Sequence, residues 1–442
     1  MDKFIKELMT GKKVLLLGFG REGQSTYRLV RRILPAQELT IADASEHIAG
    51  LEGLKGDTHL SFRLGTAYLE DIRSFDLVIK SPGISLKDMD PPLDPGKITS
   101  QTDLFLRKYS SQVIGVTGTK GKSTTSSLIC HILDQAGKDV ILLGNIGTPA
   151  FHYTDRILPG TMVVFELSSH QLQYVERSPH IGIILNLYQE HLDAYRSFEE
   201  YQSAKMNIAR FSGENDFLIY NAEDPLVLEQ VGKLCQTMQR IPFSLKKDKS
   251  GLDFHNRYLK GDHNLRNALA AAAACRLCGL SGDEIADGMD SFKGLAHRME
   301  FAGRFHGIDF YNDSIATIPE ACMAAVRSIP NVDTLILGGF DRGVDYTELA
   351  DFLIASRVST FIVTGAAGMR IADAIEKKGA GQKRVIRIHR FDEFLPYALK
   401  YTQPGHVCLL SPAAASYDEF RSFEERGMRF TGLVSRNYTM NQ

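Results

Sequence analysis

Short apolar runs alternate with longer amphipathic stretches along most of the chain. The runs are rich in Val, Ile and Leu, which is typical of strands that are buried on both faces of a parallel sheet. In the first half of the chain they are residues 14–17, 77–79, 113–116, 140–143, 163–165 and 181–185. Helical stretches such as residues 123–136 and 198–210 lie between them. This alternation predicts an α/β fold with doubly wound parallel sheets.

Two breaks in the pattern suggest domain boundaries. Residues 87–96 are rich in Pro and Gly and suit a linker. A new series of strands begins after residue 295, at 310–312, 335–337, 361–363, 385–388 and 407–410. We therefore predict three domains: residues 1–99, Rossmann-like; residues 100–298, a central ATPase domain with a phosphate loop; and residues 299–442, again Rossmann-like.

Composition argues against a nucleic-acid-binding, a secreted or a membrane-spanning protein. The chain has 442 residues and a formal net charge of −2, so no basic excess points to a nucleic-acid partner. Charged residues occupy the start, where a signal peptide needs an apolar core, and no apolar run is long enough to span a bilayer. We expect a cytoplasmic protein without a membrane partner. Cys275 and Cys278 lie in an alanine-rich helical stretch, so we expect packed thiols there and not a metal site.

A glycine-rich turn between an expected strand and an expected helix carries the clearest chemistry. Its backbone N–H groups and the helix N-terminus can surround phosphate oxygens. Lys122 would reach the terminal phosphates and Ser123 would hold Mg²⁺. The usual phosphate-loop pattern needs glycine at position 116, which here is Val116. The turn consists of Gly118, Thr119, Lys120, Gly121, Lys122, Ser123 and Thr124.

A second glycine motif follows the first expected strand. Residues 18–23 read Gly-Phe-Gly-Arg-Glu-Gly, and Asp43 ends the next expected strand. On its own this pattern indicates either a dinucleotide site, with Asp43 on a ribose hydroxyl, or a tight strand–helix turn. The first of these would make the protein an NAD-dependent oxidoreductase.

Three more residues are candidates for metal chemistry, each with a simpler interpretation. Glu166 ends an expected strand and could bind Mg²⁺, although the serines after it could merely cap a helix. His191 follows another strand, but a lone histidine is more often structural. Lys205 taken alone is an ordinary helix lysine.

Together these motifs resemble those of the Mur ligase family. The shifted glycine spacing of residues 115–123 is the form found in Mur ligases and in the related folylpolyglutamate synthetases. Residues 81–83 resemble the family's SPG turn, and residues 166–172 resemble its ELSSxQL motif. Residues 186–193 resemble its N-x-x-x-D/E-H-x-D segment, in which an acidic residue precedes a histidine. Glu190 stands where the muramoyl ligases often have Asp. Further matches are residues 144–147, 261–267, 297–298, 312–317, 338–343 and 411–427.

The last match, SPAxASxDxFxxFxxRG, is the most specific to the branch that adds glutamate to UDP-N-acetylmuramoyl-L-alanine. The resemblance implies a monomeric, ATP-dependent ligase that forms an acyl phosphate and ADP, with two Mg²⁺ sites. Lys122, His191 and Lys205 would be catalytic, and Lys205 would be carbamylated by CO₂. The implied metal ligands are Ser123, Glu166, His191 and Lys205.

The resemblance also assigns residues to each substrate. The UDP part of the acceptor would contact Gly18, Phe19, Gly20, Arg21, Asp43, Ser81, Gly83 and Asn145. Besides the phosphate loop, ATP would contact Asn267, Arg298 and Asp313. Glutamate would contact Thr317, Arg342, Ser416 and Phe423.

Two departures keep the enantiomer open. Ile315 stands where the branch usually has lysine, and Arg342 stands where it often has lysine. D-Glutamate is the default, and an L-glutamate-adding relative on the same acceptor is the alternative. Three more distant hypotheses are the oxidoreductase, a folylpolyglutamate synthetase, which lacks the first domain, and a non-catalytic binding subunit.

Overall fold

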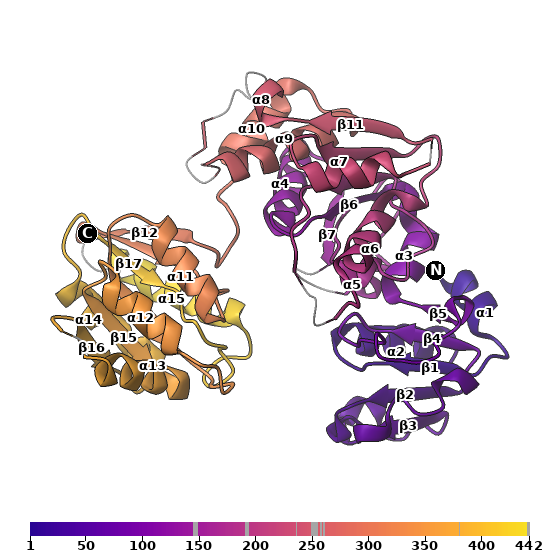
Figure 1. Ribbon diagram of the computed structural model, residues 1–442, viewed down its shortest axis with the longest axis horizontal. Helices are drawn as coiled ribbons and strands as arrows, with labels where there is room; N and C mark the ends of the chain where they lie inside the picture. Colours follow the sequence, from indigo (N-terminus) through magenta and orange to yellow (C-terminus); the bar gives the residue numbers. More distant parts are fainter. Residues whose placement is uncertain are drawn as a thin grey trace. The chain divides into compact units, whose positions relative to one another are not determined.

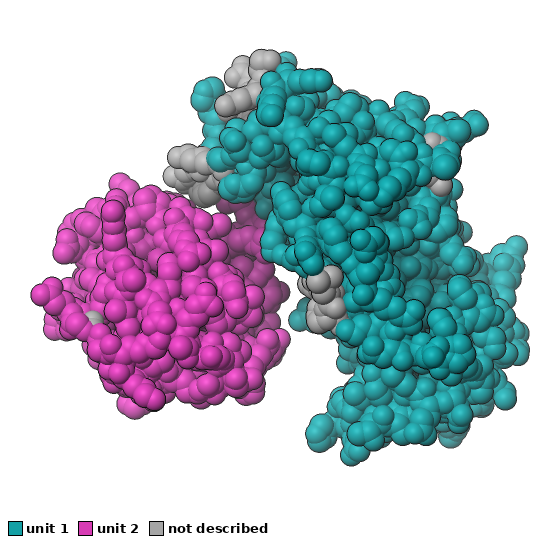
Figure 2. Space-filling view, in the orientation of Figure 1, with its two compact units in different colours: residues 1–292 teal, residues 293–442 magenta. Residues whose placement is uncertain are grey.

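A computed structural model of the chain describes residues 1–144, 149–190, 194–235, 237–248, 255–256, 259, 261–379 and 381–439. Contacts divide the chain into two compact units, residues 1–292 and residues 293–442, which are coloured separately in Figure 2. The first unit holds two sheets and the second holds one (Figure 1). The three domains remain a prediction, because these contacts divide the chain only once.

The first sheet of unit 1 is parallel, with the strand order β3-β2-β1-β4-β5. Every residue of β1 is buried, because helices and loops cover both of its faces. The elements are α1 (Asp2–Met9), β1 (Val14–Leu17), α2 (Arg21–Ile33), β2 (Leu39–Asp43), β3 (Leu60–Leu64), β4 (Leu77–Lys80) and β5 (Ile98–Thr99).

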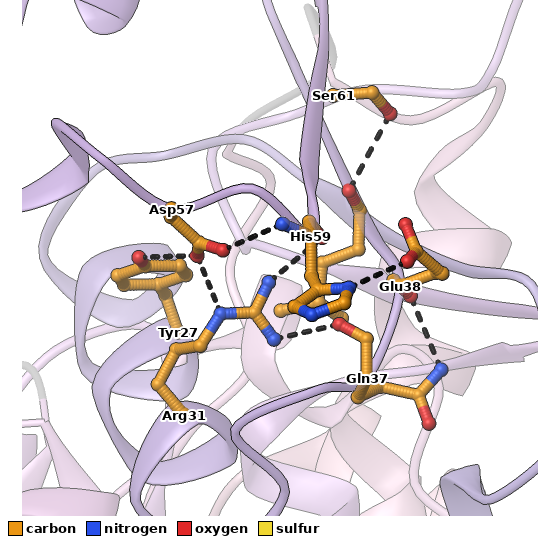
Figure 3. Close-up of polar contacts among 8 residues, drawn as sticks. Tyr27, Arg31, Gln37, Glu38, Asp57, His59 and Ser61 are labelled. Atoms are coloured by element: carbon orange, nitrogen blue, oxygen red, sulfur yellow. Dashed lines mark hydrogen bonds and ion pairs between the residues drawn. The ribbon is translucent and has the colours of Figure 1, made fainter.

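Polar contacts fix helix α2 to the segments that lead into β2 and β3 (Figure 3). The guanidinium of Arg31 donates to a carboxylate oxygen of Asp57 at 2.5 Å and to the carbonyl oxygens of Gln37 and His59 at 2.7 and 2.9 Å. The hydroxyl of Tyr27 donates to the same Asp57 oxygen at 2.7 Å. Because α2 begins directly after the first glycine loop, these contacts also hold that loop in place.

The central sheet of unit 1 is parallel as well, with the order β11-β10-β9-β6-β8-β7. Its strands are β6 (Val113–Thr117), β7 (Val140–Gly144), β8 (Met162–Glu166), β9 (Ile181–Ile184), β10 (Phe217–Asn221) and β11 (Gln239–Phe243). The helices are α3 (Gln101–Tyr109), α4 (Lys122–Gln135), α5 (Ser169–Leu172), α6 (Phe198–Arg210), α7 (Pro225–Gly232), α8 (Leu245–Asp248), α9 (Asp262–Leu277) and α10 (Gly282–Ser291).

Two apolar clusters enclose the central sheet. Helices α4, α9 and α10 pack on one face. The cluster on the other face includes α3 and α6 and continues without a break into the first sheet, which explains why the two sheets form one unit.

Unit 2 is a mixed sheet with the order β12-β13-β17-β14-β15-β16, in which only the β12–β13 pairing is antiparallel. Its strands are β12 (Glu300–Phe305), β13 (Ile308–Asn312), β14 (Val332–Gly338), β15 (Thr360–Thr364), β16 (Arg384–Arg387) and β17 (Val407–Leu410). Its helices are α11 (Pro319–Ser328), α12 (Thr347–Ala355), α13 (Gly365–Lys377), α14 (Phe394–Tyr401) and α15 (Phe423–Thr439).

The predicted fold class is confirmed, and each predicted strand matches an observed one to within three residues at either end. Five observed strands were not predicted: β3, β5, β10, β11 and the antiparallel edge strand β12. Cys275 is fully buried in α9, and burial raises its thiol pKa, in agreement with packed thiols. Within the described part of the chain, no helix has the length and apolarity needed to cross a membrane.

Candidate active site

The phosphate loop connects β6 to α4 and depends on glycine at two positions. Gly118 and Gly121 have φ angles of +153° and +86°, in the region that favours glycine. A Cβ on residue 121 would lie only 2.5 Å from Oδ1 of Asn267, so the loop passes close to α9. The backbone N–H of Lys120 donates to Oδ1 of Asn186 at 2.8 Å. These contacts hold the turn rigidly, as a phosphate-binding loop requires.

Two predicted catalytic lysines meet at this loop. Nζ of Lys122 donates to the carbonyl oxygens of Gly118 and Thr119 at 3.1 and 3.0 Å. Nζ of Lys205, from α6, donates to the same Gly118 oxygen at 2.9 Å and lies 4.9 Å from the ring centre of Tyr201. Burial, followed by the charge of Lys122, lowers the pKa of the Lys205 amine to about 7. The structure therefore presents Lys205 as a buried amine and not as a solvated helix lysine.

Ser123 and Glu166 form a hydroxyl–carboxylate pair beside the loop. Oγ of Ser123 donates to Oε1 of Glu166 at 3.1 Å, and Glu166 is fully buried at the end of β8. Both groups are hard oxygen donors of the kind that Mg²⁺ prefers. The alternative interpretation, that a serine after Glu166 caps a helix, also holds, because Ser168 caps α5. Glu166 itself takes no part in this cap and contacts Ser123.

A cavity of about 660 Å³ opens beside the phosphate loop. It has an apolar wall and several polar groups, which suits a nucleobase and its ribose. Its lining includes Lys120, Asn186, Tyr188, Phe243, His263 and Asn267. Asn267, predicted to contact ATP, thus lies both on this cavity and against Gly121.

The first glycine loop is tied to the SPG turn. Oγ of Ser81 donates to the carbonyl oxygen of Gly18 at 2.8 Å. The carboxylate of Asp43 accepts from the backbone N–H groups of Phe19 and Ser45, at 2.7 and 2.8 Å, and so fixes this loop. Gly20 and Arg21, also predicted to bind UDP, are exposed at its tip.

A second cavity, of about 290 Å³, lies between the SPG turn and the phosphate loop. Pro82 and Gly83 line it from the first sheet, and Lys122 and Lys205 line it from the central one. Its wall also contains His170, at the variable position of the ELSSxQL motif, to which the sequence assigned no role. Its position next to two predicted catalytic residues on separate elements could not be derived from sequence spacing.

Unit 2 contains the remaining predicted residues. Asp313 is buried and accepts from the backbone N–H of Met299 at 3.2 Å and from Oγ of Ser411 at 2.8 Å. Burial raises its pKa to about 6. Arg298, the other predicted ATP contact in this unit, is exposed.

The four residues predicted for glutamate lie on segments that meet within unit 2. Phe340 and Ala415 form a β-bridge, which joins the segment of Arg342 to that of Ser416. Oγ of Ser314, three residues before Thr317, donates to the carbonyl oxygen of Phe423 at 2.8 Å. The guanidinium of Arg342 lies 5.5 Å from the ring centre of Tyr417. The predicted residues Asn145 and His191 lie outside the described part of the chain.

Comparison with known proteins gives matches to Mur ligases, both for family models and for individual relatives. A family model for the Mur ligase middle domain matches residues 116–275, and one for the Mur ligase glutamate ligase domain matches residues 297–414. The chain is 36% identical to the UDP-N-acetylmuramoylalanine–D-glutamate ligase of Symbiobacterium thermophilum, over 84% of this chain and 86% of that protein. It is 32% identical to the enzyme of the same name from Thermoanaerobacter pseudethanolicus, over 97% of this chain and 99% of that protein.

Solved structures show the same fold. The UDP-N-acetylmuramate–alanine ligase of Thermotoga maritima aligns with a TM-score of 0.55 at 21% identity, over 97% of this chain and 100% of that one. The MurF ligase of Thermotoga maritima, solved in complex with ADP, aligns with a TM-score of 0.51 at 17% identity, over 82% and 90% of the two chains.

Proposed function

The chain belongs to the Mur ligase family, and we propose that it joins D-glutamate to UDP-N-acetylmuramoyl-L-alanine while converting ATP to ADP and phosphate. The relatives named above carry this activity in their names. They favour a ligase over the oxidoreductase and over folylpolyglutamate synthetase. The product is a precursor of peptidoglycan.

The observation that carries the proposal is the cavity shared by the SPG turn and the phosphate loop. An acceptor held by its UDP part on the first glycine loop extends towards Pro82 and Gly83. Its alanine carboxylate can then meet the terminal phosphate of ATP beside Lys122 and Lys205. In this arrangement, one cavity would hold the two groups that must react.

In the first step, a carboxylate oxygen of the acceptor attacks the γ-phosphorus of ATP. The bond from that phosphorus to the bridging oxygen breaks, and ADP leaves with the electron pair. The N–H groups of the loop and the ammonium of Lys122 stabilise the charge on the transferred phosphoryl group. The product of this step is an acyl phosphate.

Ser123 and Glu166 are the described residues that would hold Mg²⁺, and their oxygen atoms already lie 3.1 Å apart. Bound Mg²⁺ would neutralise phosphate charge during the transfer. His191 and a carbamylated Lys205 would complete the proposed metal ligands.

The buried position of Lys205 supports its proposed carbamylation. The neutral amine attacks the carbon of CO₂, an N–C bond forms, and a proton leaves. Because burial already disfavours the ammonium form, the amine is available near neutral pH. The carbamate places an anion next to Lys122, so the two side chains attract each other, whereas two ammonium groups there would repel.

In the second step, the amine of glutamate attacks the acyl carbon, phosphate leaves with the C–O electron pair, and the amine loses a proton. Arg342, Thr317, Ser416 and Phe423 would bind this glutamate. A guanidinium and two hydroxyls match the needs of a dicarboxylic amino acid.

The direct test is phosphate release from ATP with the acceptor present and either D-glutamate or L-glutamate added. Release with D-glutamate alone is the expected result. Release with L-glutamate alone would retain the mechanism but reassign the enantiomer, and Ile315 and Arg342 would then be the first positions to exchange. No release with either amino acid would contradict the substrate assignment.

A further inference from the structure

Arg426 is a fully enclosed arginine that the family-based assignment leaves without a role. It lies on the first turns of α15 with 2% of its surface exposed. Its guanidinium donates five hydrogen bonds, all to uncharged oxygen atoms. The acceptors are Oγ and O of Ser314 at 3.0 and 2.9 Å, O of Gly338 at 3.3 Å, O of Ala414 at 3.1 Å and O of Ala415 at 3.3 Å.

These acceptors belong to three loops that are far apart in the sequence. Each loop carries one of the residues proposed to bind glutamate: Thr317 follows Ser314, Arg342 follows Gly338, and Ser416 follows Ala415 directly. The fourth proposed residue, Phe423, begins the helix on which Arg426 itself lies. All four segments of the amino-acid site are therefore joined through one side chain.

The packing around the guanidinium leaves little freedom. A Cβ on residue 339 would lie 2.1 Å from the carbonyl oxygen of Ala415 and 3.0 Å from Nη1 of Arg426, and Gly339 has a φ of +134°. The N–H of Phe340 donates to the same Ala415 oxygen at 2.8 Å. The loops of Arg342 and Ser416 are thus in close backbone contact where Arg426 binds them.

We propose that Arg426 is a positioning residue for the incoming amino acid, which fixes the spacing of Thr317, Arg342 and Ser416 from behind the site. The proposal rests on the proposed function, since it needs these residues to bind glutamate. Arg426 acts through the loops and does not itself touch the substrate.

The geometry requires arginine in particular. Five N–H groups in one plane can reach carbonyls on three loops at once, whereas the three donors of a lysine ammonium diverge from a single point. Burial lowers the pKa of Arg426 to about 10, so the side chain stays charged at neutral pH. The carbonyl oxygens, which carry partial negative charge, solvate this cation in place of water.

The test compares Arg426→Lys with Arg429→Lys. Arg429 lies on the same helix but forms an ion pair with Asp392 at the surface. Arg429→Lys therefore controls for the replacement of an arginine by a lysine on this helix away from the amino-acid site. Each protein is assayed for D-glutamate KM and kcat, for ATP KM, for the thermal midpoint, and for hydroxylamine trapping of the acyl phosphate without glutamate. Trapping reports the first step and does not need the amino-acid site.

For Arg426→Lys we expect the glutamate KM to rise about tenfold or more, because small misplacements of binding groups have large effects. The trapping rate and the ATP KM should stay at the wild-type level, and Arg429→Lys should match the wild type throughout. An unchanged glutamate KM in Arg426→Lys that still forms the trapped acyl phosphate would overturn the proposal.

A second variant covers the case in which Arg426→Lys does not fold. Ser314→Ala removes the hydroxyl that accepts from Nε of Arg426 and donates to Phe423, and should raise the glutamate KM in the same direction but less. If it leaves that KM unchanged, the proposal fails. If the wild-type protein itself forms no trapped acyl phosphate, the proposed function fails instead.

Discussion

Lys122 and Lys205 donate hydrogen bonds to one backbone oxygen, that of Gly118. Two cations at such a short distance repel each other in a buried site, and this repulsion contributes to the lowered pKa of Lys205. Lys122 is the one we expect to act as the cation, because it is the less deeply enclosed of the two and would contact the phosphates of ATP. We therefore expect different tasks for the two lysines, Lys122 as a cation and Lys205 as a neutral amine.

Replacement of Lys122 by Met should remove the charge that stabilises the transferred phosphoryl group. We expect acceptor-dependent phosphate release to fall by about 100-fold or more, the usual effect of losing one group that stabilises transition-state charge. Lys138→Met, at an exposed position after α4, is the matched control and should retain full activity. Equal activity of the two variants would show that Lys122 does not contact the reacting phosphate.

The proposed carbamate of Lys205 predicts that the activity depends on pH and on CO₂. Its amine is protonated below a pKa of about 7 and neutral above it, and only the neutral form can take up CO₂. The initial rate should therefore rise between about pH 6 and pH 8, and in CO₂-depleted buffer it should recover when bicarbonate is added. Lys205→Arg, which cannot be carbamylated, should be inactive at every pH. A wild-type rate in CO₂-depleted buffer that does not change when bicarbonate is added would contradict the proposed carbamate.

At the scale of elements, the strand–loop–helix unit β6–α4 positions the chemistry. Gly121 and Gly137 stand at the two ends of α4, both with positive φ, but only Gly121 is crowded, by Asn267. Gly121→Ala and Gly137→Ala should each destabilise the protein by about 1–2 kcal/mol from the left-handed conformation alone. Only Gly121→Ala should also raise the ATP KM, because its methyl group would displace Asn267 or the loop. Thermal unfolding measures the loss of stability, and ATP titration measures the change in ATP KM. Similar ATP KM values for the two variants would mean that ATP does not bind at the Gly121 loop.

Most elements of the fold could be predicted because their signals are local. The apolar run of β6 and the glycines after it determine a strand and a turn within a dozen residues, whatever the rest of the chain does. The edge strand β12 could not be predicted in this way, because its sequence, Glu-Phe-Ala-Gly-Arg-Phe, has no continuous apolar run. His170 and Arg426 were missed for a different reason. Their significance depends on neighbours from other elements, and periodicity along one segment contains no information about these.

At the scale of the whole molecule, the proposed substrates are divided between the two units. Residues of unit 1 would hold the acceptor and the phosphates of ATP, and residues of unit 2 would hold glutamate, with Arg298 and Asp313 as further ATP contacts. Motifs could assign residues to substrates because each motif is continuous in the sequence. The contacts that link motifs within a unit, such as the bond from Ser81 to Gly18, required the structure.

This division predicts where each substrate protects the backbone from hydrogen exchange. A non-hydrolysable ATP analogue with Mg²⁺ should slow exchange in residues 117–124 and 185–188, since bound phosphates and base restrict these loops. D-Glutamate added to the complex with analogue and acceptor should slow exchange in residues 314–317, 338–343 and 413–418 of unit 2, where its proposed ligands lie.

Arg342→Ala should abolish the protection of unit 2 by D-glutamate and leave the protection of residues 117–124 and 185–188 by the ATP analogue, because only glutamate needs that guanidinium. Arg357→Ala, an exposed arginine of the same unit, is the control and should behave as the wild type. Glutamate-dependent protection confined to residues 117–124 would mean that the amino acid binds in unit 1, and the assignment of Thr317, Arg342, Ser416 and Phe423 would then be wrong. Protection of both sets by the nucleotide analogue alone would mean that ATP, through Arg298 and Asp313, already orders the amino-acid site before glutamate arrives.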